Sequence, residues 1–463
     1  MKKLKDLIDT NLDITIKGIT DDSRDVRDGY LFVATHGFHV DHFDYIEDAI
    51  KKGCVFLVVD REIEIDFPHL VVDSILDFYK ELCSKFYDVN LNDYHFIGIT
   101  GTDGKTTTST IVKEIIGDCA YIGTNGVTIG DETIPTNNTT PCISELYEDI
   151  SKIGKSGLTN ISMEVSSEAL LHDRVSHFQF DIVAFTNITG DHLNVHGSFD
   201  EYRNCKLKLL DYVKKDGFVF VNGDDPNLQN IHCSNLYTFG FDSCNDIVIT
   251  DVKYGNRDTD ITVKNIDHIV HLHSPLIGKY NVYNVVLAYL IGLKFGIDES
   301  TIIDRIKKLK PIKGRCEFLD FGQNYDIVLD YAHTINGVNT ILDTFQNYPF
   351  IITVTGAAGG REHEKRPIIG KNVIEKSDIS IFTMDDPRYE DVNEIIDQMV
   401  GKEKDYVRIP DREDAICYAL SIAPPKSVVL IIGKGRDNYM AIEDKKVPYN
   451  DYDVVQRFFN KKS

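Results

Sequence analysis

Short apolar runs rich in β-branched residues recur along the chain, and a glycine-containing turn and a helix-like stretch follow each of them. The runs are CVFLVVD (54–60), HFIGITG (95–101), FDIVAFTNI (180–188), GFVFVNG (217–223), DIVLDYAH (326–333), FIITVTGAAGG (350–360), DISIFTMDD (378–386) and SVVLIIGKG (427–435). Their almost continuous apolar character is typical of strands buried on both faces, as in a parallel sheet covered by helices. The strand-then-helix order therefore predicts an α/β architecture.

Two polar segments divide this pattern. YDVNLND (87–93) precedes the first glycine loop, and in KKLKPIKGR (307–315) a proline and a glycine follow a lysine-rich helix end. Proline and glycine at such a position indicate a connection between folded units. We therefore expect three domains, over 1–93, 94–310 and 311–463. The length of 463 residues agrees with this number, since a domain has roughly 150 residues.

Composition and charge narrow the possible partners. Fifty basic and 73 acidic residues give a formal charge of −23, which argues against nucleic-acid and membrane partners because both require a positive surface. An anionic small molecule still fits, because a pocket can be locally basic. The longest apolar stretch, 285–295, is far short of the ~20 residues that a membrane helix needs. Nine cysteines without CxxC pairs, and an N-terminus without an export signal, lead us to expect a cytoplasmic protein.

The clearest chemical motif is GITGTDGKTTT (98–108), directly after a predicted strand. Gly101 and Gly104 allow a tight turn whose N–H groups face phosphate oxygens, and the helix that follows favours an anion at its N-terminus. Lys105 would neutralise terminal phosphates, and the Thr106 hydroxyl is placed to bind Mg²⁺. Ile99 stands where the strict phosphate-loop pattern has glycine, so an ordinary glycine turn is the alternative. The loop alone does not distinguish ATP from GTP.

Two further side chains are candidates for a magnesium site. Glu164 follows LTNISM, at the expected end of a strand, and His192 follows a second strand-like run. Ligands gather at the carboxyl edge of open α/β sheets, so both side chains are expected near the phosphate loop. Carboxylate oxygen is a preferred Mg²⁺ ligand, and imidazole is less suited. Lys206, one helical turn after Tyr202, would by itself be a solvated surface lysine.

The order of these and other motifs resembles the Mur ligase family, specifically the UDP-N-acetylmuramoyl-tripeptide synthetase type. The resemblance covers essentially the whole chain. The segments that carry it are DDSRDVRDGYLFVA (21–34), TGTDGKTTT (100–108), NTTP (138–141), EVSSEALLHDRV (164–175), TNITGDHLNVHG (186–197), YRNCK (202–206), NVYN (281–284), GRCEF (314–318), DYAHT (330–334), GGREHEKRP (359–367), DDPR (385–388) and GKGRDNY (433–439).

The resemblance implies an N-terminal UDP-binding domain, a central phosphate-loop ATPase domain and a C-terminal Rossmann-like domain. It also implies ATP-dependent formation of an amide bond, with release of ADP and phosphate. ATP would phosphorylate the carboxylate of a UDP-linked muramoyl dipeptide, and a free amino acid of the lysine or meso-diaminopimelate class would attack the acyl phosphate. Two Mg²⁺ ions and a CO₂-derived carbamate on Lys206 would assist, in a monomeric enzyme of cell-wall precursor synthesis.

The resemblance further implies a role for particular residues. Those of the UDP-linked donor site would be Ser23, Arg24, Asp41, His42, Asn138, Thr139, Thr140, Ser166, His172 and Arg174. Those of the ATP site would be Gly101, Thr102, Asp103, Gly104, Lys105, Thr106, Thr107, Asn281, Asn284, Arg315, Asp330 and His333. The metal would be held by Thr106, Glu164, His192 and carbamylated Lys206, and the catalytic residues would be Lys105, Glu164, His192 and Lys206. The acceptor amino acid would be bound by Arg361, Asp385, Asp386, Arg388, Gly433 and Asp437.

Several positions depart from the family pattern. The customary Asp-Asn-Pro-Arg reads Asp-Asp-Pro-Arg at 385–388, Gly-Lys-Gly-His-Glu reads Gly-Lys-Gly-Arg-Asp at 433–437, and the Pro-Asp after DYAHT is Ile-Asn at 335–336. Glu168 replaces a histidine, and the segment at 41–42 lacks a glycine. Arg388 would favour diaminopimelate by clamping a carboxylate, whereas the charges of Asp386 and Asp437 would favour lysine.

Other classes of protein remain open at this point. One alternative is an archaeal pseudomurein-type peptide ligase, and another is a Mur-like subunit without full ligase activity. A folate or cyanophycin ligase is a third, although the uridine-binding segment around Ser23 and Arg24 argues against it.

Overall fold

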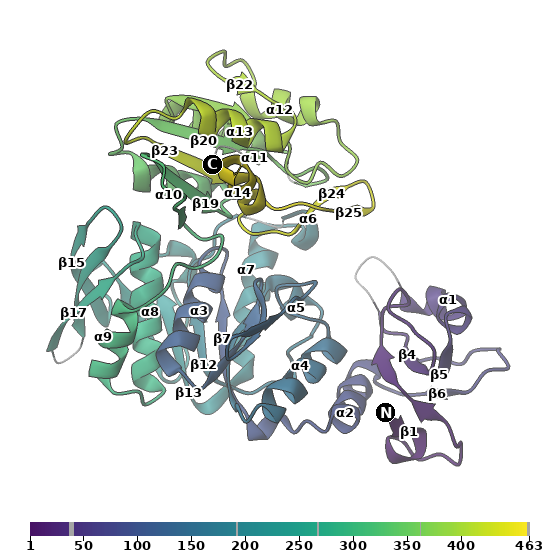
Figure 1. The fold of residues 1–463 in the computed structure, drawn as a ribbon. Coiled ribbons are helices and arrows are strands. Elements are labelled where there is room, and N and C mark those ends of the chain that lie inside the picture. Colours follow the sequence, from purple (N-terminus) through teal and green to yellow (C-terminus); the bar gives the residue numbers. More distant parts are fainter. Residues whose placement is uncertain (37–40, 191–192, 266–267, 362, 461–463) are drawn as a thin grey trace.

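The computed structural model describes residues 1–36, 41–190, 193–265, 268–361 and 363–460. Within these residues, sheets of four, eleven and six strands form the centres of three successive units. Figure 1 shows the N-terminal unit beside the central one and the C-terminal unit above it. The eight apolar runs all contain strands of these sheets, so the predicted α/β fold class is confirmed.

The N-terminal sheet is parallel throughout, in the order β3-β4-β5-β6. Its elements are β3 (Gly18–Thr20), β4 (Tyr30–Val33), β5 (Cys54–Val59), β6 (His69–Val71) and α1 (Ile46–Lys51), with a separate pair β1 (Lys2–Lys3) and β2 (Thr15–Ile16). Helix α2 (Ile75–Tyr87) leads into the central unit and contacts α4 (Ile143–Lys155). The Lys80 ammonium of α2, almost fully buried, donates to Ser176 Oγ at 2.5 Å.

The central sheet has the order β10-β9-β8-β11-β7-β12-β13-β14-β15-β16-β17. It is parallel from β8 to β15 and antiparallel at both ends. The strands are β7 (His95–Thr100), β8 (Cys119–Gly123), β9 (Gly126–Ile129), β10 (Glu132–Ile134), β11 (Asn160–Glu164), β12 (Phe180–Phe185), β13 (Val213–Asn222), β14 (Leu236–Gly240), β15 (Ile247–Tyr254), β16 (Thr259–Asn265) and β17 (His268–Ser274).

Helices cover both faces of this sheet because its strands are apolar on both sides. Along β12, Ile182 and Ala184 pack with α3 (Lys105–Ile116), α8 (Lys279–Lys294) and α9 (Glu299–Lys307), whereas Val183 and Phe185 pack on the side of α4. The shorter helices α5 (Ser167–Leu171), α6 (Leu193–His196) and α7 (Phe199–Leu207) lie near the carboxyl edge. Adjacent strands β11, β7 and β12 end together at that edge, which places Glu164, the phosphate loop and Thr186 side by side.

The C-terminal sheet has the order β18-β19-β23-β20-β21-β22 and is parallel except for β18. Its strands are β18 (Glu317–Leu319), β19 (Asp326–Asp330), β20 (Ile351–Thr355), β21 (Ile379–Phe382), β22 (Val407–Arg408) and β23 (Val428–Ile432). Helices α10 (Ile335–Phe345), α11 (Lys365–Lys376) and α12 (Val392–Val400) pack on one face, and α13 (Arg412–Ile422) and α14 (Asp451–Asn460) on the other. A hairpin of β24 (Tyr439–Ile442) and β25 (Lys445–Pro448) precedes α14.

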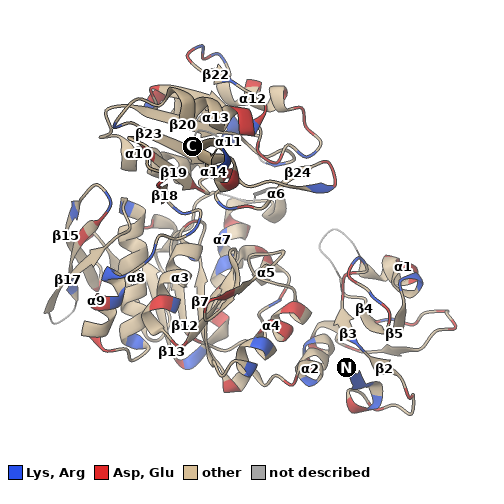
Figure 2. Cartoon of the chain, in the orientation of Figure 1, with Lys and Arg blue, Asp and Glu red and all other residues tan. Residues whose placement is uncertain are grey.

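Charged residues are spread over the helices of all three units. Figure 2 shows acidic and basic positions interspersed on helices such as α4 and α9. In the part of the chain that the structure describes, no helix has the length and apolarity needed to span a bilayer.

Candidate active site

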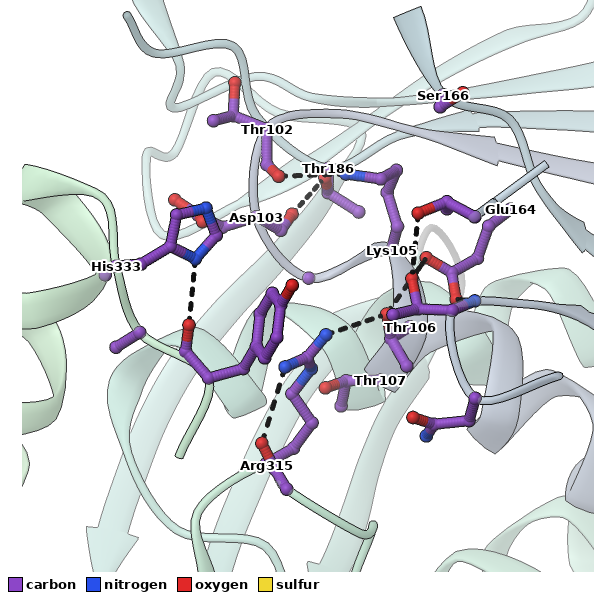
Figure 3. A pocket seen from close by; sticks show the side chains of 18 of the residues that line it. Thr102, Asp103, Lys105, Thr106, Thr107, Glu164, Ser166, Thr186, Arg315 and His333 are labelled. Atoms are coloured by element: carbon purple, nitrogen blue, oxygen red, sulfur yellow. Dashed lines mark hydrogen bonds between the residues drawn. The ribbon is translucent and has the colours of Figure 1, made fainter. Parts of the chain in front are cut away.

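A cavity of about 910 Å³ lies where the carboxyl edge of the central sheet faces the C-terminal unit. Most of its lining comes from the phosphate loop and α7, from the loops after β8, β10, β11, β12 and β13, from the start of α8, and from segments 313–315, 330–341 and 436–439 together with Arg361. Figure 3 shows these side chains converging from both units. The lining residues all lie between 102 and 439, so the cavity is built without the N-terminal unit.

The predicted phosphate loop connects β7 directly to α3. Gly101 and Gly104 have φ angles of +150° and +85°. A Cβ at Gly101 would lie 1.9 Å from Thr186 Oγ1, and one at Gly104 would lie 2.5 Å from Asn284 Oδ1. Both positions therefore need glycine, for conformation and for space. Thr102 lies in this loop and Thr107 in the first turn of α3, and both line the cavity.

Two ammonium groups meet at one carbonyl of this loop. Lys105 Nζ donates to the carbonyl oxygens of Gly101 and Thr102, each at 2.9 Å. Lys206 Nζ donates to the same Gly101 oxygen at 2.8 Å and lies 4.6 Å from the centre of the Tyr202 ring. Lys206 is only 1% exposed, so its interpretation as a solvated surface lysine is wrong. Helix α7 buries it because that face of the helix packs against the loop. A site with two such cations suits a polyanion.

Glu164, the last residue of β11, is completely buried and accepts hydrogen bonds at both carboxylate oxygens. Oε1 accepts from the Tyr121 hydroxyl and from Thr124 N at 2.9 Å. Oε2 accepts from Thr106 Oγ1 at 2.9 Å and from Thr124 Oγ1 at 3.3 Å. Sequence reasoning missed Tyr121 and Thr124. The sequence did offer one signal of this contact, the glycine at 123. In the structure a Cβ at this position would lie 2.2 Å from Glu164 Oε1, so a larger residue would not fit.

The donor set fits a magnesium ion shared with a nucleotide. Thr106 and Glu164 offer hydroxyl and carboxylate oxygens beside the phosphate loop, and Mg²⁺ is usually held by one or two carboxylates together with substrate phosphates. Among the described residues, no group of three or more histidine, cysteine or acidic side chains forms a cage that would hold a metal alone. The predicted ligand His192 lies outside the described residues.

The C-terminal unit adds a cation to the phosphate loop. Arg315 Nη2 donates to Thr106 Oγ1 at 3.1 Å, and its guanidinium lies 4.5 Å from the centre of the Tyr331 ring (Figure 3). Asp330 accepts from Cys316 N at 2.6 Å and Ala332 N at 2.7 Å, and burial raises its pKa. The Nδ1 atom of the neighbouring His333 lies 2.9 Å from the Tyr331 carbonyl oxygen.

The predicted asparagines of α8 lie on the other side of the loop. Asn284 lines the cavity and accepts from Thr108 Oγ1 at 3.1 Å. Asn281 is outside the lining, and its Oδ1 accepts from Asn284 Nδ2 at 3.2 Å. Asn281 therefore orients Asn284 and does not itself face the cavity.

The residues predicted for the UDP-linked donor fall into two groups. Asn138, Thr139, Ser166 and Arg174 line the cavity, and buried Thr140 joins them through bonds to Glu164 O, Ser166 and Arg174. His172 is half-buried and lies outside the lining. Ser23, Arg24, Asp41 and His42 belong to the N-terminal unit, also outside the cavity.

The N-terminal group forms its own polar surface. Arg24 donates to both carboxylate oxygens of Asp22, and this hydrogen bonding lowers the pKa of Asp22. Asp41 caps the turn that begins at His42, and His42 Nδ1 lies 3.0 Å from Thr35 Oγ1. A ligand that reaches both donor groups would have to span the space between the N-terminal unit and the cavity.

The residues predicted for the acceptor surround a buried lysine that sequence reasoning missed. Lys434 is 1% exposed, and its ammonium lies 2.8 Å from Asp386, 3.6 Å from Asp437 and 3.7 Å from Asp385. Burial alone would lower the pKa of Lys434, but these carboxylates raise it. Burial raises the pKa of Asp437 to about 6. The charge of Asp386, expected to attract a lysine substrate, is therefore compensated inside the protein by Lys434.

The remaining acceptor residues differ in position. Arg361 and Asp437 line the cavity, whereas Arg388 lies outside the lining, with its N–H bonded to Ala441 O at 3.0 Å. Gly433 has a φ of +113°, and a Cβ there would lie 2.5 Å from Asp385 Oδ2. Of the predicted acceptor residues, those that face the cavity thus offer one guanidinium and one carboxylate, which suit the carboxylate and ammonium of an amino acid.

Taken together, the fold and site define a nucleotide-dependent enzyme whose phosphate loop faces a second α/β unit across the substrate cavity. The sequence matches the profiles of the Mur ligase family, catalytic domain, over residues 15–87, the Mur ligase middle domain over 99–292, and the Mur ligase, glutamate ligase domain, over 314–435. The chain belongs to the Mur ligase family, and it is an ATP-dependent ligase that forms amide bonds.

Individual relatives agree over nearly the whole length. The chain is 35% identical over 458 residues to the UDP-N-acetylmuramoyl-L-alanyl-D-glutamate–2,6-diaminopimelate ligase of Bacillus cereus, covering 95% of this chain and 93% of the relative. It is 34% identical to the enzyme of that name from Fusobacterium nucleatum, covering 98% and 96%.

Solved structures show the same fold. A UDP-N-acetylmuramoyl-L-alanyl-D-glutamate–2,6-diaminopimelate ligase superimposes with a TM-score of 0.65 at 25% identity, covering 100% of this chain and 99% of that one. MurF from Thermotoga maritima in complex with ADP superimposes with a TM-score of 0.68 at 18% identity, covering 96% and 97%. A Mycobacterium tuberculosis folylpolyglutamate synthase covers only 76% of this chain.

Proposed function

We propose that this ligase adds 2,6-diaminopimelate to UDP-N-acetylmuramoyl-L-alanyl-D-glutamate, a step of peptidoglycan precursor synthesis. The observation that carries the proposal is the convergence of Lys105, Lys206 and Glu164 on one loop, in a chain whose full-length relatives bear that activity in their names. These bacterial relatives do not favour the pseudomurein alternative. The retained site residues also argue against a subunit without ligase activity.

The chemistry begins with transfer of the terminal phosphoryl group of ATP to the donor carboxylate. The loop N–H groups and the start of α3 hold the phosphates, and Lys105 offsets the charge that develops on the transferred group. Thr106 and Glu164 would hold Mg²⁺, which supplies further positive charge when bound. Lys206 supplies an ammonium in its unmodified form, and as a carbamate it would supply anionic oxygens to a second Mg²⁺.

The second step joins the acceptor amine to the acyl carbon, and inorganic phosphate leaves. Arg361 and Asp437 would orient the amino acid from the C-terminal unit, with the amine directed toward the acyl phosphate. Holding three substrates in line across the cavity supplies the orientation part of catalysis. We also propose a cytoplasmic location, because nine cysteines without CxxC pairs suit a reducing compartment.

The test is a panel of amino acids with UDP-muramoyl dipeptide and ATP, with products identified by mass. We expect phosphate release to require both the dipeptide and an amino acid, and diaminopimelate to be the preferred acceptor. Use of a carboxyl-¹⁸O donor should transfer label to inorganic phosphate. Lysine as the preferred acceptor would overturn the proposed specificity, whereas unlabelled phosphate would overturn the acyl-phosphate mechanism.

A further inference from the structure

The side chain of Asp103 points out of the phosphate loop toward the C-terminal unit. Its backbone is fixed on the other side: Asp103 N donates to Asn187 Oδ1 at 3.0 Å, and its carbonyl accepts from Thr186 Oγ1 at 2.6 Å (Figure 3). Its carboxylate lies 3.4 Å from Thr334 Oγ1 and 3.4 Å from Asn336 Nδ2. The phosphate loop and the first turn of α10 are therefore in direct contact, although more than 200 residues separate them in sequence.

The first turn of α10 is chemically suited to a carboxylate. Thr334 Oγ1 caps the helix by accepting from Gly337 N at 2.9 Å, so the hydroxyl proton is left for Asp103. Asn336 contributes an amide N–H, and the positive end of the helix dipole favours a negative charge at this place. Thr334 is 3% exposed, so water does not compete freely for its hydroxyl.

We propose that Thr334 and Asn336 form a docking point for Asp103 that orients the C-terminal unit over the phosphate loop and keeps the Asp103 charge away from the phosphates. A carboxylate in a phosphate loop repels ATP unless its charge is compensated. The first turn of α10 provides that compensation, and in doing so it fixes the distance between the two walls of the cavity. Asn336 is thus a positioning residue, which acts through Asp103.

The test is an exchange of charge between the two partners. Asn336→Asp places two carboxylates side by side, and Asp103→Asn combined with Asn336→Asp restores one amide and one carboxylate, with the charge now on the helix turn. Asn339→Asp is the matched control: it adds the same charge to the same helix, where Lys376 Nζ lies 3.3 Å from the Asn339 amide oxygen. Asn336→Ala removes the donor without adding charge.

The readouts are ATP affinity by calorimetry and the radius of gyration by small-angle scattering. The proposal rests on ATP binding at this loop, and neither readout depends on the acceptor or on turnover, so a different acceptor specificity would leave the test intact. We expect Asn336→Asp to weaken ATP binding about tenfold, since like charges a few ångströms apart at a partly exposed site cost roughly that much. We also expect the radius of gyration to increase.

The exchanged double variant should return both values to within about threefold of the wild type, as expected for a pair that acts as a unit. Asn336→Ala should lose less ATP affinity than Asn336→Asp, and Asn339→Asp should have the ATP affinity and the radius of gyration of the wild type. Wild-type affinity and scattering in Asn336→Asp would overturn the proposal. A double variant as impaired as Asn336→Asp would also overturn it, because the loss would then not arise from the pairing with Asp103.

Discussion

Replacing Tyr121 with phenylalanine removes one hydroxyl next to the proposed metal ligand and leaves the ring in place. The Tyr121 hydroxyl and Thr124 N both donate to Glu164 Oε1, whereas Oε2 accepts from two hydroxyls, one of which is Thr106. These bonds hold Oε1 in place. Oε2 can bind a cation once the Thr106 hydroxyl rotates so that its oxygen also faces the cation. Tyr121 therefore fixes the orientation of the carboxylate.

The magnitude follows from the burial of Glu164. A hydrogen bond to a buried charged group contributes about 1.5–3 kcal/mol, and loss of a residue that orients a metal ligand typically costs about 10- to 100-fold in metal affinity. We therefore expect Tyr121→Phe to lower the affinity for the divalent cation by at least about tenfold. The variant should fold normally, since Phe fills the same space.

The assay is Mn²⁺ binding by electron paramagnetic resonance with a non-hydrolysable ATP analogue, followed by the Mg²⁺ dependence of turnover. Tyr289→Phe is the matched control, because Tyr289 is also buried and donates to a carboxylate, that of Glu299 at 2.5 Å, outside the cavity. Unchanged Mn²⁺ affinity in Tyr121→Phe would refute the reasoning. An equal loss in Tyr289→Phe would show that the effect is not specific to Glu164.

Three further changes test other parts of the structure. Arg412→Ala should lower the free energy of unfolding of the C-terminal unit, measured in urea, by about 3–5 kcal/mol, because it leaves fully buried Asp451 without its ion-pair partner at 2.8 Å. The control Arg457→Ala, at an exposed position, should lower it by less than about 1 kcal/mol. Equal losses in the two variants would contradict this account. The KM for the amino acid should rise as the pH falls through about 6, because Asp437 takes up a proton there and loses the charge that holds the substrate ammonium. Asp437→Asn should have a high KM that does not depend on pH in this way. A wild-type pH profile in that variant would count against the role of Asp437 in binding the amino acid. Lys206→Ala should lose most activity and regain part of it with added short carboxylates, whereas an unimpaired variant would rule out a role for this lysine.

Local sequence patterns were sufficient to predict the strands and the phosphate loop. The strand at 95–100 and the glycines at 101 and 104 depend on contacts within a few residues, so periodicity and glycine spacing indicate them directly. Glu164 at the end of a strand was predictable for the same reason. The family resemblance then supplied the order of the three units and a set of site residues.

Other features of the site depend on tertiary packing and could not be predicted from local sequence patterns. Lys206 lies on a helix of mixed polarity, and its burial depends on the loop against which α7 packs. Tyr121 reaches Glu164 because β8 and β11 are neighbours in the sheet, although 43 residues separate the two side chains. Lys434 was hidden because its three carboxylate partners come from two separate loops.

The α/β class and the chemistry of the phosphate loop could be predicted from the order of the residues, because both follow from short-range spacing and backbone geometry. Which charges are compensated, and which face the cavity, became known from the folded structure. Those properties depend on residues far apart in the chain, and the energy of a charge is set by the groups that surround it in the folded protein.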